Sequence, residues 1–498
     1  MTQPTPDMEK MRQLSSAFER NRALCGEVLD DVVRSTYLYA LRLAATKTLR
    51  TRTGDTLTLL DELSAYRQWL GERMAEMASE GWSLHGDEAA SGPGTRAWQG
   101  VWHRPKLLDF YPTLAKKLRD ILLQIMSHHP SLDPASIEDA LAHKTLALAL
   151  GGGGGTGFVH QALFQLLETH HIRPSLMTGT SMGALMGFFR AMQVDYDAAM
   201  SVLHMPGWLT LTRYISPCIG NTRHGLPSFC RFHFSRMLES IVPHFGWTNV
   251  PRFSELKIPF ASITSGILRD HDVIETIAPK HAGIFSSIFN MTNLTWKAAC
   301  SHATQIAHAL TTTHSVIEVP MGFDALTRDL NASDGIAFSA LVPGVINYEI
   351  PASHVQSRKI IDNVFERDKL YRCVDGGLTS NVPVRALRRE IDTLKHGHTN
   401  VHIIGIDVFA PQLNDGVFYP LEQIANANAD IDAYYADAFV RLKHLLSPMN
   451  LSPSLKQFKW LNHHFEMEFK NELEIIKYVM APLRPITKLN IDLFIEEN

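Results

Sequence analysis

The chain has 498 residues, of which 45% are hydrophobic and 20% are charged, a balance typical of a folded globular protein with two or three structural units. A net charge of −4 at pH 7 argues against a nucleic-acid-binding protein, which would usually be strongly basic. The five cysteines are scattered and form no CxxC pair, so they indicate a reducing compartment rather than a disulfide framework.

Signals for export or membrane insertion are missing from the pattern. The first 20 residues lack the apolar core of a secretory signal. No run of about 18 apolar residues predicts a transmembrane helix. We therefore expect a cytoplasmic protein whose contact with membranes or lipid surfaces is peripheral.

Helical patterns fill the first part of the chain, and we expect an N-terminal helical region over residues 1–143. Asp55 or Thr56 is the predicted N-cap of the second helix. The clearest amphipathic patterns cover residues 27–45, 54–77 and 112–130.

From residue 144 the pattern changes to short apolar strands that alternate with helices, which is typical of an α/β protein with a parallel sheet. We expect this domain to cover residues 144–412. After Asp415 the pattern becomes helical again, and it predicts a C-terminal helical extension over residues 413–498. The strand candidates are residues 145–150, 175–179, 258–264, 372–375 and 401–409.

Five consecutive glycines, residues 151–155, follow the first strand candidate and precede a helical pattern. Gly152, Gly154 and Gly157 fit the G-x-G-x-x-G spacing of a dinucleotide site, in which the backbone approaches an anion at a helix N-terminus. Such a site also needs an acidic residue at the end of the second strand to hold the ribose. The segment "IRPSLMTGTSMGAL" contains neither Asp nor Glu, which disfavours a nucleotide.

The second strand instead leads into Gly179-Thr180-Ser181-Met182-Gly183, which fits G-x-S-x-G. After a strand and before a helix, this pattern predicts a nucleophile elbow, with Gly179 and Gly183 giving room for a strained turn. Both turns should lie at the carboxyl edge of the sheet, where ligands bind. The glycine loop is therefore expected to bind an oxyanion, through the amides of Gly153, Gly154 and Gly155.

A nucleophilic serine needs a base, and two kinds of candidate exist. Asp375 ends a strand candidate, and Gly376 and Gly377 can turn its carboxylate back over the same sheet edge. An ordinary turn is the commonest use of an Asp-Gly pair, so this segment alone leaves the role of Asp375 open. A histidine is the alternative, although those near or after the last strand candidate lie in no motif: His402, His444, His463 and His464.

Taken together, three segments resemble the patatin-like phospholipase family: "GGGGTG" at 152–157, "GTSMG" at 179–183 and "DGGLTSNVP" at 375–383. The resemblance covers about residues 144–412. It implies a three-layer α/β fold with a mostly parallel central sheet between N- and C-terminal helical regions. It also implies hydrolysis of lipid acyl esters by a dyad without histidine, in which Ser181 is the nucleophile and Asp375 the base.

The family's oxyanion loop corresponds to Gly152, Gly153, Gly154, Gly155 and Gly157. The family usually has Arg or Lys before the final glycine, where this chain has Thr156, so a charged anchor is in doubt. No metal or other cofactor is expected, and the expected partner is a lipid substrate rather than a nucleic acid. A triacylglycerol lipase or a non-catalytic lipid-binding module on the same fold remain alternatives, and the sequence does not indicate whether a protein activator is needed.

Two apolar segments between the elbow and the aspartate are candidates for lipid contact. Residues 281–296 place several large apolar side chains on one helical face, and residues 204–215 have a similar character. Each could act as a lid, enter a bilayer interface or simply pack on the core.

Overall fold

The computed structural model describes residues 6–51, 53–78, 102–197, 214–220, 222–226, 228–269, 315–343, 345–393, 400–409, 430–448 and 450–489. The candidate lipid-contact segment 281–296 and most of 204–215 lie outside these residues. Within them, no helix has both the length and the apolar character needed to cross a membrane.

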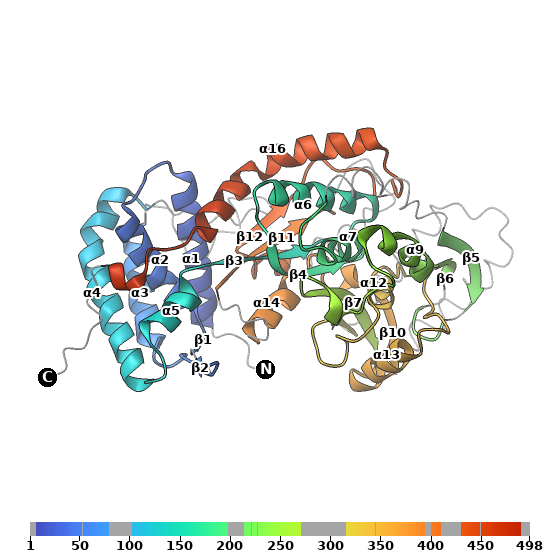
Figure 1. Ribbon diagram of the computed structural model, residues 1–498, viewed down its shortest axis with the longest axis horizontal. Helices are drawn as coiled ribbons and strands as arrows, with labels where there is room; N and C mark the ends of the chain where they lie inside the picture. The colour runs from blue at the N-terminus through green and yellow to red at the C-terminus, as the bar shows by residue number, and fades with distance from the viewer. Residues whose placement is uncertain are drawn as a thin grey trace.

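A seven-stranded mixed sheet forms the centre of the molecule (Figure 1), in the order β10-β7-β4-β3-β11-β12, with β8 paired to β7. The pairs from β12 through β11, β3 and β4 to β7 are parallel, whereas β8 and β10 run antiparallel to β7. The strands are β3 (Thr145–Leu150), β4 (Pro174–Thr180), β7 (Phe260–Leu268), β8 (Val316–Met321), β10 (Leu370–Asp375), β11 (Val401–Asp407) and β12 (Ala438–Arg441).

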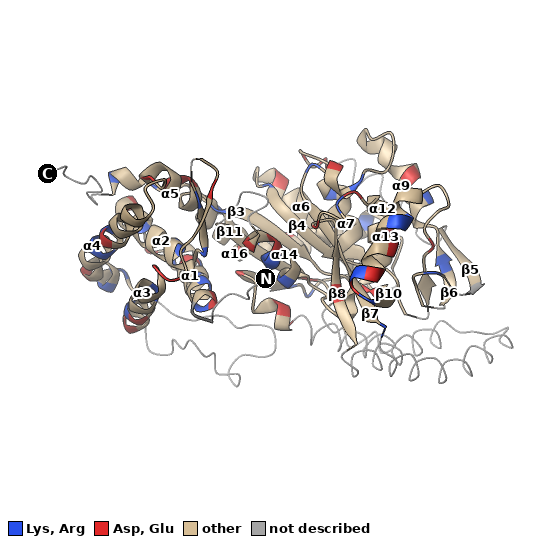
Figure 2. Ribbon diagram, turned by 90° about the horizontal axis from the view of Figure 1, so that it is seen from below, with Lys and Arg blue, Asp and Glu red and all other residues tan. Residues whose placement is uncertain are grey.

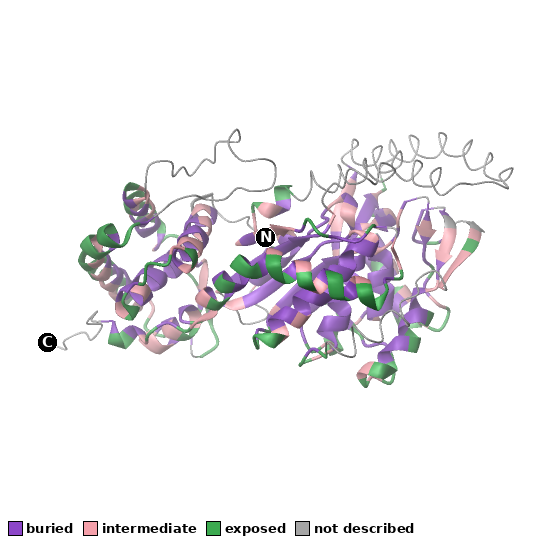
Figure 3. Ribbon diagram, turned by 90° about the horizontal axis from the view of Figure 1, so that it is seen from above, coloured by how far each residue is buried: buried purple, intermediate pink, exposed green. Residues whose placement is uncertain are grey.

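The central strands β3, β4 and β7 contain no charged residue, and charged residues lie mainly on the surrounding helices (Figure 2). These strands are buried along most of their length (Figure 3), because helices cover both faces of the sheet. The predicted fold class, an α/β protein with a mostly parallel central sheet, is confirmed.

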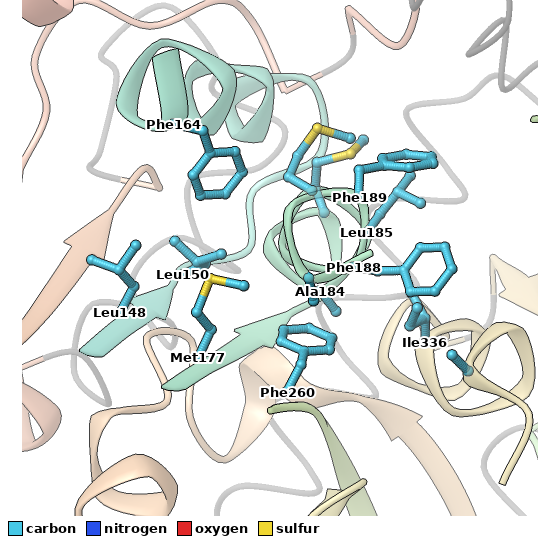
Figure 4. Packing of buried hydrophobic residues seen from close by; sticks show 14 of the residues in the cluster. Leu148, Leu150, Phe164, Met177, Ala184, Leu185, Phe188, Phe189, Phe260 and Ile336 are labelled. Atoms are coloured by element: carbon cyan, nitrogen blue, oxygen red, sulfur yellow. The ribbon is translucent and has the colours of Figure 1, made fainter. Parts of the chain in front are cut away.

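Helices cover the sheet in two layers. On one face Leu148, Leu150 and Met177 share a core with Phe164 of α6 (His160–Thr169), whereas Phe188 of α7 (Met182–Ala191) lies toward Ile336 (Figure 4). That face also receives α9 (Phe234–Ile241), α12 (Ala332–Ser339), α13 (Val355–Arg367) and α16 (Leu455–Met480), beside α6 and α7. On the other face, a smaller core packs Ala147 and Ala149 against α14 (Val384–Asp392).

The N-terminal residues form a helical unit with its own core. Near the end of the chain, Leu483, Ile486 and Leu489 return to this core, and α16 extends from the sheet to reach it (Figure 1). The elements of the N-terminal unit are α1 (Pro6–Leu24), α2 (Asp31–Ala45), the hairpin β1 (Thr48–Arg50) and β2 (Thr56–Thr58), α3 (Ser64–Met77), α4 (Arg104–His128) and α5 (Pro134–Leu141).

The remaining elements are short. A three-stranded sheet, in the order β5-β6-β9, lies beyond α9 in Figure 1. Its strands are β5 (Ile215–Gly220), β6 (Ser228–Phe232) and β9 (Ile346–Asn347). The 3-10 helices are η1 (Gly154–Val159), η3 (Val242–Phe245), η4 (Phe253–Glu255), η5 (Gly376–Leu378) and η6 (Ile486–Lys488).

Some local predictions are wrong. Asp55 and Thr56 do not cap a helix, because residues 56–58 pair with β1 and α3 starts only at Ser64. The pattern after Asp415 is not wholly helical, since residues 438–441 form β12 at the edge of the central sheet. The side chain of Asp437 fixes that strand by accepting a hydrogen bond from the Ile403 amide at 2.7 Å. Part of the predicted helical extension 413–498 therefore completes the sheet.

Candidate active site

Strand register alone brings the elbow and the aspartate together. In β7, Ile263 pairs with Thr180 of β4, and the next residue, Thr264, pairs with Asp375 of β10. Because β8 occupies the other edge of β7 at both positions, β4 and β10 share one edge. They run in opposite directions, so their carboxyl ends face each other there. Ser181, the next residue after β4, is thereby placed beside Asp375.

Ser181 has the backbone geometry of a strained turn. Its φ of 51° and ψ of −119° place a non-glycine residue at positive φ, as the N-cap residue of α7. Both flanking glycines are required by close backbone contacts. A Cβ atom on Gly179 would lie 2.5 Å from the Gly183 oxygen, and one on Gly183 would lie 2.3 Å from the Leu150 oxygen.

The carboxylate of Asp375 is held at the start of the turn that follows β10. It accepts a hydrogen bond from the Gly377 amide at 2.8 Å. Burial raises the pKa of Asp375 to about 6, while the Gly377 amide and a hydrogen bond with Ser181 act in the opposite direction. Gly376 packs against the β7 backbone, since a Cβ there would lie 2.1 Å from the Ile263 oxygen. The raised pKa makes the Asp375 carboxylate a stronger base than an ordinary carboxylate.

The glycine loop approaches the same point, but two of its amides already have partners. The Gly152 amide donates to the backbone oxygen of Asn381 at 3.2 Å, and the Gly155 amide donates to the backbone oxygen of Pro448 at 2.7 Å. Among the described residues, none accepts a hydrogen bond from the amides of Gly153 and Gly154. The loop therefore has fewer amides without a partner among the described residues, and so fewer candidate donors to an oxyanion, than the sequence predicted.

Steric contacts explain the other glycines of the loop. A Cβ on Gly152 would lie 3.0 Å from the Ser181 Cβ, which shows how closely the loop passes the elbow. Gly154 has a φ of 59°, in the left-handed region that favours glycine. Gly157 packs against Met182, whose Cγ would lie 2.5 Å from an added Cβ.

Thr156, the residue that departs from the family pattern, fastens the loop. Its hydroxyl donates to the Gly153 oxygen at 2.9 Å, and its amide approaches the same oxygen at 3.3 Å. In a trans peptide the N–H and C=O groups point in opposite directions. Fixing the Gly153 oxygen therefore also fixes the direction of the Gly154 amide.

Polar contacts that the sequence did not reveal hold the segment after Asp375 against β4. The hydroxyl of Thr180 donates to the backbone carbonyl oxygen of Ser380 at 2.8 Å. The Ser380 hydroxyl in turn donates to Asp432 at 2.7 Å, and Arg385 donates to the other oxygen of that carboxylate at 2.6 Å. Asp432 lies some 50 residues beyond Ser380, outside every motif, so no local pattern could have identified it.

The histidines considered as alternative bases have no described contact with Ser181. His402 is buried within β11, and neither ring nitrogen has a described partner. His444 and His463 are exposed near or on α16. His160 lies nearer the loop, but its Nε2 is bound to the Gly151 oxygen at 2.9 Å, and burial lowers its pKa to about 4 despite that bond. It is therefore neutral near pH 7.

Within the described residues, no group of three or more His, Cys, Asp or Glu side chains is placed to hold a metal ion.

Comparison with known proteins agrees with the arrangement of these segments. Residues 148–388 match the family model described as patatin-like phospholipase. None of the curated proteins that were searched matches the chain. The match contains the glycine loop, the elbow and the aspartate turn. Residues 148–388 therefore form a patatin-like phospholipase domain, a family-level match that supports lipid acyl hydrolysis.

Proposed function

We propose that this protein is a serine lipid acyl hydrolase that cleaves carboxylic esters of lipids, with Ser181 as nucleophile and Asp375 as base. The observation that carries the proposal is the register of β4, β7 and β10, which sets the two residues beside each other at one edge of the sheet. The strained backbone of Ser181 and the raised pKa of Asp375 support the same roles.

In the first half of the reaction, Ser181 Oγ attacks the ester carbonyl carbon while its proton passes to the carboxylate of Asp375. The carbonyl oxygen becomes an oxyanion and receives hydrogen bonds from the amides of Gly153 and Gly154. One such donor contributes about 3–4 kcal/mol to acyl transfer. The tetrahedral species collapses as the carbon–oxygen ester bond breaks, and the alcohol leaves with the proton from Asp375.

In the second half, Asp375 takes a proton from a water molecule that attacks the acyl-enzyme. The same two amides stabilise the second oxyanion. Collapse releases the fatty acid and returns the proton to Ser181 Oγ. A carboxylate with a pKa of about 6 is better matched to these transfers near neutral pH than one with the ordinary value of about 4.

A substrate panel tests the proposal and separates its variants. Wild type and Ser181→Ala are assayed on phospholipid, lysophospholipid and triacylglycerol, and a fluorophosphonate probe reports the reactive serine. We expect hydrolysis of at least one class, its loss in Ser181→Ala, and labelling at Ser181 alone. The relative rates separate a phospholipase from a triacylglycerol lipase. Labelling at a different serine, or full activity in Ser181→Ala, would contradict the assignment.

The protein must meet its substrate at a lipid surface, so peripheral membrane contact is part of the proposal. Vesicle sedimentation with Ser181→Ala measures binding separately from turnover. A non-catalytic lipid-binding module would bind vesicles without hydrolysing any member of the panel.

A further inference from the structure

The segment that ends α12, residues 339–341, contacts the backbones of both candidate catalytic residues. The Ser181 amide donates to the Ser339 hydroxyl oxygen at 2.8 Å. The Asp375 amide donates to the Leu341 oxygen at 2.8 Å. Ser339 and Leu341 are themselves almost fully buried. One short segment therefore holds the two residues from the same side.

The Ser339 hydroxyl also ties this segment to β7, because it donates to the Ile263 oxygen. A serine hydroxyl has one donor and two acceptor positions, so both bonds are compatible. Ile263 is the residue opposite Thr180, directly before the position opposite Asp375. The hydroxyl thus sits at the junction of β4, β7 and β10.

The bond from Ser181 has a specific consequence for the elbow. At the end of β4 the Ser181 amide leaves the strand ladder, and its positive φ is a conformation that a non-glycine residue adopts only when its surroundings enforce it. A buried amide without a partner would add a further cost. The Ser339 oxygen supplies that partner and so favours the strained turn.

We propose that Ser339 is a positioning residue that sets the Ser181 hydroxyl against Asp375, an inference that rests on the proposed function of that pair. Removing its hydroxyl frees the Ser181 amide and the Ile263 oxygen together. The elbow then loses the contact that enforces its turn, while the glycine loop and the substrate contacts remain.

The test compares Ser339→Ala with Ser333→Ala in the full-length protein, using a long-chain p-nitrophenyl ester. Ser333 is a matched control: it is also fully buried on α12, and its hydroxyl bonds Asn331 rather than the elbow. We expect Ser339→Ala to lower kcat by about 100-fold with little change in KM, the size expected of a small misplacement. Ser333→Ala should keep a near-wild-type kcat.

The pH profile gives a second readout that loss of general stability would not change. Burial, the Gly377 amide and the Ser181 hydroxyl set the pKa of Asp375, and the last of these lowers it. Weakening the Ser181 bond should therefore move the acid limb of kcat/KM to higher pH. If Ser339→Ala does not fold, Ser339→Cys nearly preserves the volume with a weak acceptor and should show the same changes.

Two results would overturn the proposal. One is a kcat and an acid limb in the Ser339 variant that match wild type. The other is an equal loss of kcat in Ser333→Ala. Ser181→Ala, run in parallel, separates this failure from that of the proposed function, because its inactivity would keep the nucleophile assignment intact in either case.

Discussion

At the scale of single residues, the proposed mechanism depends on the protonation state of Asp375. In the proposed mechanism its carboxylate form accepts the serine proton, and that form predominates above its pKa of about 6. His160, which lies beside the glycine loop, does not titrate near pH 6, because burial lowers its pKa to about 4. We therefore predict that kcat/KM rises with pH through about 6 and then levels. A rate measured from pH 4 to 9 on a non-ionising ester checks this, and a flat profile below pH 6 would exclude Asp375 as the base.

Thr156 provides a second prediction at this scale. Thr156→Val nearly preserves shape but removes the hydroxyl bond to the Gly153 oxygen and leaves only the longer contact from the Thr156 amide, so the Gly154 amide is held less firmly in its direction. We predict that kcat falls about 10- to 100-fold, a fraction of one oxyanion donor's contribution, and that Thr156→Ser restores most of it.

Thr36→Val is the matched control, because Thr36 is also buried and its hydroxyl also bonds a backbone oxygen, at 2.8 Å. It lies in α2, away from the site. Equal loss of kcat in both valine variants would assign the effect to stability rather than to the loop.

At the scale of elements, the tight fit between the glycine loop and the segment before α16 is the main feature. Gly154→Ala would place a Cβ 2.6 Å from the Pro448 oxygen at a φ of 59°. Gly246→Ala meets the same kind of backbone strain at a φ of 78°, but in open space. We predict that both variants lose about 1–2 kcal/mol of stability from positive φ, and that Gly154→Ala alone loses most of its hydrolysis.

Denaturant unfolding and initial rates, measured on both glycine variants, make this comparison. Near-wild-type hydrolysis in Gly154→Ala would show that the loop geometry does not determine the rate.

The sequence predicted the interior strands because each contains a short apolar stretch that alternates with helical patterns, as in β3 and β11. It missed β8 and β12, which lie at sheet edges. Pro320 in β8 argues against a strand, and an edge tolerates it. β12 has only four residues and sits within a pattern that favoured a helix. Edge strands need only one apolar face or none, so periodicity identifies them poorly.

The site was predicted in the same uneven way. Ser181, Asp375 and the glycines lie in local motifs whose spacing is visible in the chain. Ser339, Asp432 and Pro448 act through contacts with residues far away in sequence, and Pro448 acts through its backbone oxygen. Such roles depend on tertiary packing and not on residue spacing, so no pattern could assign them.

At the scale of the whole molecule, a buried ion cluster joins the N-terminal unit to the sheet. Glu19 of α1 forms an ion pair with Lys144, the residue just before β3, at 2.6 Å. It forms a second ion pair with Arg42 of α2 at 3.2 Å. All three side chains are almost fully buried. Removing one partner from a buried cluster leaves an uncompensated charge.

We predict that Lys144→Met destabilises the protein by about 3 kcal/mol, whereas Lys116→Met, on the exposed face of α4, changes stability by less than about 0.5 kcal/mol. Urea unfolding of the two variants measures this. Equal stabilities would mean that the cluster does not hold the two parts together.

The claim on which the proposed mechanism depends is that Asp375 takes the proton of Ser181, and one measurement tests it most directly. Hydrolysis of a lipid ester is compared between wild type and Asp375→Asn, with vesicle binding and thermal unfolding as controls. The amide is nearly isosteric with the carboxylate but cannot accept the proton. We predict that folding and vesicle binding survive while hydrolysis falls by orders of magnitude. Hydrolysis near the wild-type rate would show that Asp375 is only a turn residue and would contradict the mechanism.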